Sequence, residues 1–323
     1  MYVSALLAFG DSFMEQGNNN YINTLSKANF LPYGKDFLGG KPTGRLCNGR
    51  TLCDFLAEAL RVKNYLPAYL DPLIEDKDLQ TGVSFASAGS GLDPLTSTQT
   101  STIPISTQLD MFKEYVGKLK RNVGVETANN IITNSVVVVS IGNNDLLLSL
   151  PYRRLQYDVP TYSNMLVKRV LNLTQEIYML GVRRIVVLST PPIGCLPAVR
   201  TIGGGPQRAC VDEENNVAQL FNNNLKQQLQ LWTTTVPQSK VAFIDYYGTL
   251  MSIIENPQKY GFDVVDVGCC GTGEIEFSIL CNKLAATCEN HSKYFFWDSL
   301  HPTEKGYNVI VNHIIEDLVN ALF

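Results

Sequence analysis

The chain has 323 residues, of which 45% are hydrophobic and 17% are charged, and its 26 basic and 30 acidic side chains give a net charge of −4. The apolar fraction suffices for a large core, whereas the lack of basic blocks excludes a nucleic-acid-binding protein, which needs a cationic face to neutralise phosphates. No apolar run approaches the ~20 residues of a membrane-spanning helix, so we expect no transmembrane segment.

Short apolar runs alternate with longer amphipathic segments along the chain. The first run, residues 5–9, predicts a strand, and β-branched runs follow at 83–86, 136–141, 184–189 and 241–245. They are almost continuously apolar, which is typical of strands covered on both faces. Helical patterns occupy 51–60, 106–116, 162–180, 212–233 and 303–322. The alternation predicts a three-layer α/β/α fold with a central five-stranded parallel sheet.

Neither a linker nor an internal repeat divides the chain, so we expect a single domain over residues 1–323. The stretch 96–107, rich in Ser and Thr, predicts an exposed loop. Glycines at 203–205 predict another, which a disulfide between Cys195 and Cys210 could staple. Active sites of open α/β sheets gather where loops leave the carboxyl ends of the strands, so candidate residues are sought there.

Cysteines and glycosylation sequons indicate the cellular compartment. Eight cysteines and two sequons, at Asn172 and Asn290, favour an oxidising secretory route. Cys47 and Cys53 could pair or stay reduced. The other six lie in the second half of the chain: Cys195, Cys210, Cys269, Cys270, Cys281 and Cys288. These six suit disulfides best, with a connectivity that stays open, and free buried thiols are the next alternative. A metal site comes last, because no histidine stands at ligand spacing. We expect a secreted, extracellular or vacuolar protein whose leader has been removed.

The first predicted strand ends at a serine, Ser12, in a turn rich in Gly and Asn. A serine nucleophile needs a base, which is usually a histidine. Of the three histidines, His313 falls on the predicted C-terminal helix and His291 lies in a sequon, which leaves His301. Asp298, three residues earlier, can reach back around a turn to hydrogen-bond the imidazole and fix its tautomer.

Acyl transfer also needs donors for the developing oxyanion. The third predicted strand ends in Gly142-Asn143-Asn144-Asp145, where an asparagine amide is well placed. Glycines follow the second strand, and a glycine there lets the backbone approach a substrate and offer its N–H. Each segment alone is a common turn. A serine, a glycine and an asparagine follow three successive predicted strands, and one Asp/His pair lies near the C-terminus. This order along the chain indicates that the four segments share one active site.

The blocks that carry these residues read FGDSFMEQGNNN (9–20), FASAGSG (85–91), GNND (142–145) and DSLH (298–301), and the connecting segments include PPIGCLP (191–197) and CCGTG (269–273). Together they resemble the plant secreted branch of the GDSL family, within the SGNH hydrolase superfamily. The resemblance covers essentially the whole chain and implies a flavodoxin-like SGNH hydrolase fold. The segments LPAYLDP (66–72) and TGVSF (81–85) are similar to those of plant extracellular lipases.

The resemblance implies a role for each residue of the site. Ser12 is the nucleophile, His301 the general base and Asp298 the residue that orients it. The backbone N–H groups of Ser12 and Gly89 and the side-chain amide of Asn144 form the oxyanion hole.

Three details of the resemblance stay open. Gly91 is the alternative to Gly89 as the second backbone donor. Glu15 stands where the family often has Asp, and Ala88 where Gly is frequent. Neither departure removes a catalytic group, and Glu15 could either reshape the mouth of the site or keep the same hydrogen bond with a longer arm.

The sequence therefore predicts a serine esterase or lipase that works through an acyl-enzyme on Ser12, with no metal and no organic cofactor. The alternative is an acyltransferase that passes the acyl group to an alcohol. The expected partner is a small-molecule or lipid ester, and we expect a monomer that binds no nucleic acid. The substrate-binding residues, acyl length and alcohol are not predicted.

Overall fold

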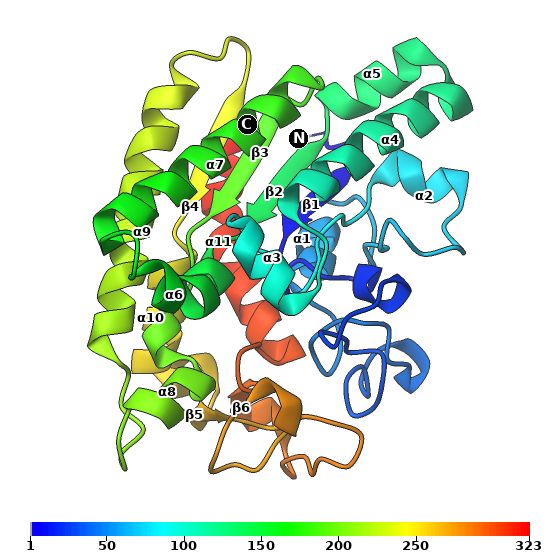
Figure 1. Cartoon of the computed structure of the whole chain (residues 1–323). Coiled ribbons are helices and arrows are strands. Elements are labelled where there is room, and N and C mark those ends of the chain that lie inside the picture. Colours follow the sequence, from blue (N-terminus) through cyan, green and yellow to red (C-terminus); the bar gives the residue numbers. More distant parts are fainter. Residues whose placement is uncertain (1) are drawn as a thin grey trace.

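The computed structural model describes residues 2–323. Its central sheet has four parallel strands in the order β1-β2-β3-β4 (Figure 1). These are β1 (Leu6–Gly10), β2 (Val136–Ser140), β3 (Arg184–Leu188) and β4 (Lys240–Ile244). Every residue of β1 and β2 is buried, as their unbroken apolar sequence predicts, because helices cover both faces of the sheet.

The second predicted strand, 83–86, lies beside β1 in the parallel direction but keeps only a single bridge to it, between Ser84 and Ala8. Backbone hydrogen bonds still join the two segments, from Ala8 N–H to Val83 and from Phe85 N–H to Ala8. On this segment, the side-chain amide of Asn18 donates to the carbonyls of Ser84 and Ala86. On the side away from β1, Ser84 also bridges Ala68 in the parallel direction and exchanges backbone hydrogen bonds with Pro67 and Tyr69. The segment thus extends the sheet through isolated bridges without becoming a regular strand.

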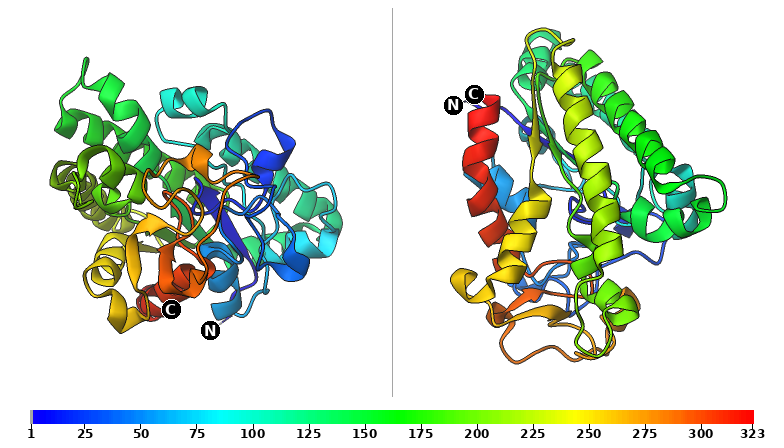
Figure 2. Two further views of the ribbon diagram at one scale, coloured as in Figure 1. Left: turned by 90° about the horizontal axis from the view of Figure 1, so that it is seen from below. Right: turned by 90° about the vertical axis from the view of Figure 1, so that its left-hand side faces the viewer.

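Helices cover both faces of the sheet (Figure 2). One face carries α4 (Ile105–Val123), α7 (Val159–Met179) and α9 (Asp212–Thr233), and the other carries α1 (Leu52–Ala59), α10 (Tyr246–Glu255) and α11 (Glu304–Leu322). The predicted three-layer α/β/α architecture is confirmed. The predicted helix at 212–233 has the observed bounds, because its apolar residues keep one helical period throughout.

Shorter elements complete the fold. They are α2 (Asp76–Thr81), α3 (Pro94–Thr100), α5 (Val125–Thr133), α6 (Leu150–Arg153), α8 (Pro197–Gly203), η1 (Asn18–Tyr21), η2 (Leu38–Gly40), the π-helical turn η3 (Asp145–Ser149), η4 (Ile193–Cys195), η5 (Pro257–Tyr260), η6 (Ser278–Leu280) and η7 (His291–Lys293). A separate two-stranded sheet, β5 (Val264–Gly268) and β6 (Tyr294–Phe296), was not predicted. It precedes the segment that carries Asp298 and His301.

The prediction of an exposed loop at 96–107 was wrong. Helix α3 covers its first part and α4 begins at Ile105, and Thr96 and Ser97 are buried. Asp93 caps α3 by accepting from the N–H of Leu95, and Thr96 donates to the buried carboxylate of Asp145. Hydroxyl groups that have such partners can be buried at little cost.

Three disulfides are present, and they join Cys195 to Cys210, Cys269 to Cys288 and Cys270 to Cys281. The first closes the glycine-containing segment at 203–205, as expected. Cys47 and Cys53 are buried and free. Besides the main core, a second small core contains Ala28, Tyr33, Cys269, Cys270, Cys281 and Trp297. Among residues 2–323, no helix has the length and apolar character needed to cross a membrane.

Candidate active site

The residues singled out from the sequence lie in the segments that follow the strands. Ser12 lies two residues beyond β1, Gly89 follows the bridged segment, and Asn144 lies between β2 and η3. Asp298 and His301 belong to the turn between β6 and α11. Since β1 and β2 are parallel neighbours, the segments that carry Ser12 and Asn144 leave the sheet at the same end, where the carboxyl ends of the strands lie.

The turn that carries Ser12 depends on Gly10 and Asp11. Gly10 has φ +128°, and a Cβ there would overlap the carbonyl oxygen of Ser140 in β2, so only glycine fits. The buried Asp11 accepts the N–H of Phe13 with Oδ1, and its carbonyl accepts from Met14. Burial raises the pKa of Asp11 well above its ordinary value. The chain therefore reverses sharply at Ser12, which is 7% exposed.

Asp298 and His301 form a buried pair. Nδ1 of His301 lies 2.9 Å from both carboxylate oxygens of Asp298, and the N–H groups of Leu300 and His301 donate to Oδ1 at 2.8 Å. Burial by itself would raise the pKa of Asp298, but the charge and hydrogen bond of His301 and the other donors outweigh it and hold this pKa below its ordinary value. The carboxylate is thus ionised and fixes the imidazole through Nδ1.

The other ring nitrogen of His301, Nε2, is buried and has no hydrogen-bond partner among residues 2–323. The imidazole packs edge-on against Phe13, the residue after Ser12, with ring centroids 5.7 Å apart. Contact between these rings brings the turn after β1 next to the Asp298–His301 turn. An unpaired buried nitrogen at this place is available for proton transfer.

Three N–H donors near the carboxyl ends of the strands have no hydrogen-bond acceptor in the described part of the chain. Neither the backbone N–H of Ser12 nor that of Gly89 donates to another residue, whereas that of Gly91 is directed at Ser97 Oγ, 3.5 Å away. Asn144 donates one of its two amide hydrogens to the carbonyl of Ser90, which holds the side chain in place and leaves the second hydrogen free.

Two buried side chains that the sequence analysis missed hold these segments together. The amide of Gln108, on α4, bonds both the N–H and the carbonyl of Gly10 and also reaches Ser90. Asp145 accepts the N–H groups of Leu92 and Asp93, and burial raises its pKa to about 6. Its position directly after Asn144 was a signal in the sequence, whereas nothing in the sequence marked Gln108.

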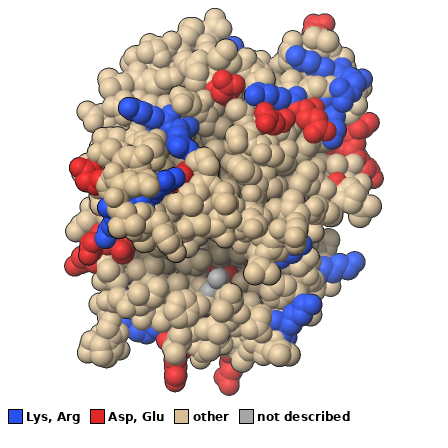
Figure 3. Space-filling model, viewed as in Figure 1, with Lys and Arg blue, Asp and Glu red and all other residues tan. Residues whose placement is uncertain are grey.

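A hollow crosses the molecular surface between α6 and β6, below the carboxyl ends of the central strands (Figure 3). Its walls show very few Lys, Arg, Asp or Glu side chains. Within residues 2–323, no group of three His, Cys, Asp or Glu residues is arranged to hold a metal ion.

The family model for the GDSL-like lipase/acylhydrolase family matches residues 6–314 of this chain. The chain belongs to this family, and it is a carboxylic ester hydrolase of the serine type. It is 44% identical over 323 residues to GDSL esterase/lipase EXL3 of Arabidopsis thaliana, covering 99% of this chain and 89% of that protein. It is 42% identical over 334 residues to GDSL esterase/lipase EXL2 of the same plant, with 98% and 88% covered.

Solved structures similar to this GDSL hydrolase share much less sequence. A phospholipase A1 from Streptomyces albidoflavus NA297 is 14% identical, with 97% of this chain and 100% of that chain covered at a TM-score of 0.44. An extracellular lipase from Streptomyces rimosus gives the same identity at a TM-score of 0.43, with 97% and 100% covered.

Glu15, which stands where the GDSL family often has Asp, joins the segments that carry Ser12 and Gly89. Its fully buried carboxylate accepts the N–H of Gly17 at 2.6 Å and of Asn19 at 3.3 Å with Oε1, and that of Ala88 at 2.9 Å with Oε2. Of the two roles considered for this residue, the longer arm that reaches backbone donors fits this geometry.

Glu15→Ala is expected to lower the free energy of unfolding by about 2 to 5 kcal/mol, because three buried N–H groups lose their acceptor. Burial raises the pKa of Glu15 from 4.5 to about 7. The folded protein therefore keeps a proton that the unfolded chain has released, and the contribution of Glu15 to stability falls as the pH rises from about 4.5 to 7. Denaturant unfolding at several pH values should show the largest deficit at low pH.

Glu58→Ala is the matched control, because Glu58 is half exposed and only pairs with Arg50 on the surface. Its cost should stay below about 1 kcal/mol. Equal losses in the two variants would contradict the bridging role of Glu15.

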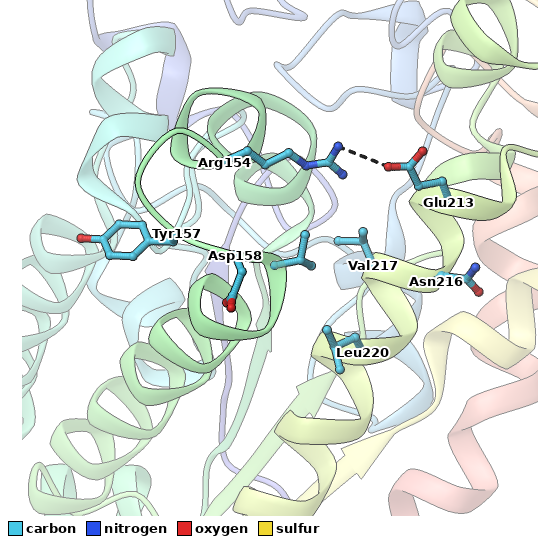
Figure 4. Close-up of a pocket in the computed structure, with 8 residues that line it drawn as sticks. Arg154, Tyr157, Asp158, Glu213, Asn216, Val217 and Leu220 are labelled. Atoms are coloured by element: carbon cyan, nitrogen blue, oxygen red, sulfur yellow. Dashed lines mark hydrogen bonds and ion pairs between the residues drawn. The ribbon is translucent and has the colours of Figure 1, made fainter.

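A separate open groove lies between the segment after α6 and the first turns of α9 (Figure 4). It is lined by Arg154, Tyr157, Asp158, Val159, Glu213, Asn216, Val217 and Leu220. An ion pair of 3.2 Å between Arg154 and Glu213 crosses it. None of the candidate catalytic residues lines this groove, so it is distinct from the active site.

Proposed function

We propose that this protein hydrolyses carboxylic esters through an acyl-enzyme on Ser12, with His301 as general base and Asp298 as its orienting partner. The observation that carries the proposal is the buried Asp298–His301 pair, whose free Nε2 lies in a ring packed against the neighbour of Ser12. A carboxylate that fixes one imidazole nitrogen and leaves the other unpaired is the arrangement that activates a serine.

In the proposed reaction, Ser12 Oγ attacks the ester carbonyl and His301 takes its proton. The tetrahedral intermediate collapses, His301 protonates the leaving alcohol, and the acyl group stays on Ser12. Water then repeats the sequence and releases the acid. The negatively charged Asp298 stabilises the imidazolium that forms in each half-reaction.

We assign the oxyanion hole to the N–H groups of Ser12 and Gly89 and the amide of Asn144. Gly89 is preferred to Gly91, because the N–H of Gly91 is directed at Ser97 whereas that of Gly89 is open in the described chain. Donors held in advance by the fold stabilise developing charge without reorganising, and each is worth about 2.7 to 4 kcal/mol in comparable sites. The hydrogen bond from Asn144 to Ser90 provides such fixation.

Acyl transfer to an alcohol would use the same acyl-enzyme. No feature of residues 2–323 favours an alcohol over water as the acceptor, so hydrolysis is the function proposed.

The test is to trap the acyl-enzyme analogue. An alkyl p-nitrophenyl phosphonate should modify one residue, and peptide mass spectrometry should find the adduct on Ser12, with loss of esterase activity in proportion to labelling. Modification of a different residue, or full activity after complete labelling of Ser12, would contradict the proposal.

We also propose that the protein is secreted, either to the extracellular space or to the vacuole, and is glycosylated at Asn290 rather than Asn172. Three disulfides support an oxidising compartment. Asn290 is exposed at the start of η7, whereas the sequon of Asn172 lies inside α7, where the buried Thr174 hydroxyl bonds helix carbonyls. Glycopeptide mass spectrometry of the protein from a plant secretory system tests this assignment.

A further inference from the structure

Tyr33 belongs to none of the motifs that mark the site in the sequence, yet its hydroxyl contacts the proposed catalytic machinery. Tyr33 is 3% exposed and follows η1. Its hydroxyl donates to Oδ2 of Asp298 at 2.7 Å, across 265 positions of the chain. The proposed orienting carboxylate therefore has a partner from the opposite end of the sequence.

The hydrogen bonds around the Asp298 carboxylate are unevenly distributed. Oδ1 receives the backbone N–H groups of Leu300 and His301, which belong to the same turn. Oδ2 receives only the imidazole and Tyr33 among residues 2–323. Tyr33 is thus the one donor that ties this carboxylate to a distant part of the fold.

The second small core fixes the tyrosine ring. Tyr33 packs there with Trp297, which directly precedes Asp298, and with two disulfide-bonded pairs of cysteines. Phe30 contacts its ring edge-on at 5.5 Å between centroids. A ring held this tightly pays little conformational entropy for each hydrogen bond it makes.

We propose that Tyr33 is a positioning residue of this hydrolase, which orients the Asp298 carboxylate and offsets part of its charge, and thereby sets the pH at which His301 can accept the serine proton. The proposal rests on the proposed role of His301 as general base. Tyr33 touches neither substrate nor the reacting atoms and acts through Asp298.

The electrostatic surroundings agree with this role. Burial first, and then the neighbouring Asp298, raise the pKa of Tyr33 well above its ordinary value, so it remains a donor. The titratable groups that act on Asp298 are Tyr33, His301, Cys47, Tyr307 and Glu276. Burial keeps Cys47 and Tyr307 neutral, whereas it raises the pKa of Glu276 to about 7. Because Glu276 is common to wild type and variant, comparing their pH profiles isolates Tyr33.

Tyr33→Phe is the decisive variant. Without the phenol, Asp298 carries more uncompensated charge and holds the imidazolium proton more firmly. The acid limb of the kcat/KM profile should therefore move to higher pH by about half a unit, and kcat should fall about threefold to tenfold with little change in KM.

Tyr115→Phe is the matched control. Tyr115 is fully buried on α4, and its hydroxyl donates to the carbonyl of Leu79, away from the site. This variant should lose comparable stability and keep the wild-type pH profile. In an Asp298→Asn background, Tyr33→Phe should cause no further shift, because the two act through one hydrogen bond.

An unmoved acid limb in Tyr33→Phe, with a stability loss like that of Tyr115→Phe, would overturn the inference and leave Tyr33 a structural residue. Activity retained in His301→Ala would instead overturn the proposed function itself. The two failures are therefore distinguishable.

Discussion

Ser12→Ala is expected to lower kcat for a short-chain p-nitrophenyl ester by at least about 10⁴-fold. The substitution removes the only atom proposed to bond the acyl group, and the oxyanion donors alone provide a small residual rate. Steady-state assays measure the loss, and the phosphonate reagent should no longer label the protein. Thermal unfolding should stay close to wild type, because the change removes a single oxygen.

Ser135→Ala is the control for this experiment. Ser135 is fully buried, and its hydroxyl donates to the carbonyl of Ile132 at the amino-terminal end of β2, opposite to the active site. The control should retain wild-type kcat. More than about a tenth of wild-type activity in Ser12→Ala would place the nucleophile elsewhere.

His301→Ala is expected to cause a loss of similar size, because nucleophile and base act as a unit and removing either disables both half-reactions. The substitution should lower kcat and leave KM nearly unchanged, since an imidazole used for proton transfer contributes little to binding the ground state. Removal of His301 also leaves the buried Asp298 carboxylate without its imidazole hydrogen-bond partner, so some loss of stability should accompany the kinetic effect.

The other two histidines of the chain are matched controls. His313 is exposed on α11, and His291 pairs with Asp36 at 3.3 Å on the surface. His313→Ala and His291→Ala should each keep most of the wild-type activity. An inactive His291→Ala with an active His301→Ala would reverse the proposed assignment of the base.

Strands and helices could be predicted from the sequence where one physical constraint acts on many consecutive residues. A parallel strand buried on both faces must be apolar throughout, and a helix packed on a sheet must repeat its apolar residues with the helical period. β2 and α9 satisfy these rules, and their positions were predicted. The candidate site was sought after the strands for a similar reason, because parallel strands bring their carboxyl ends to one end of the sheet.

Local composition gave a wrong prediction where a contact with a residue far away in the sequence decides the structure. The Ser/Thr-rich stretch reads as an exposed loop, but Asp145, about 50 positions later, accepts the hydroxyl of Thr96 and allows this side of α3 to be buried. Likewise, the segment at 83–86 reads as a strand, but it keeps only isolated bridges to its two neighbours, and Asn18 donates to two of its carbonyls. Neither contact leaves a periodic trace in the sequence.

The sequence alone determined the alternation of strands and helices, because each depends on residue type at short, regular spacing, and its motif blocks indicated the family and the candidate residues of the site. Tertiary structure alone decided which cysteines pair, how Glu15 joins the segments of Ser12 and Gly89, and that Tyr33 bonds Asp298 across 265 positions. Such contacts arise when the whole chain packs, since side chains far apart in sequence meet only through the fold.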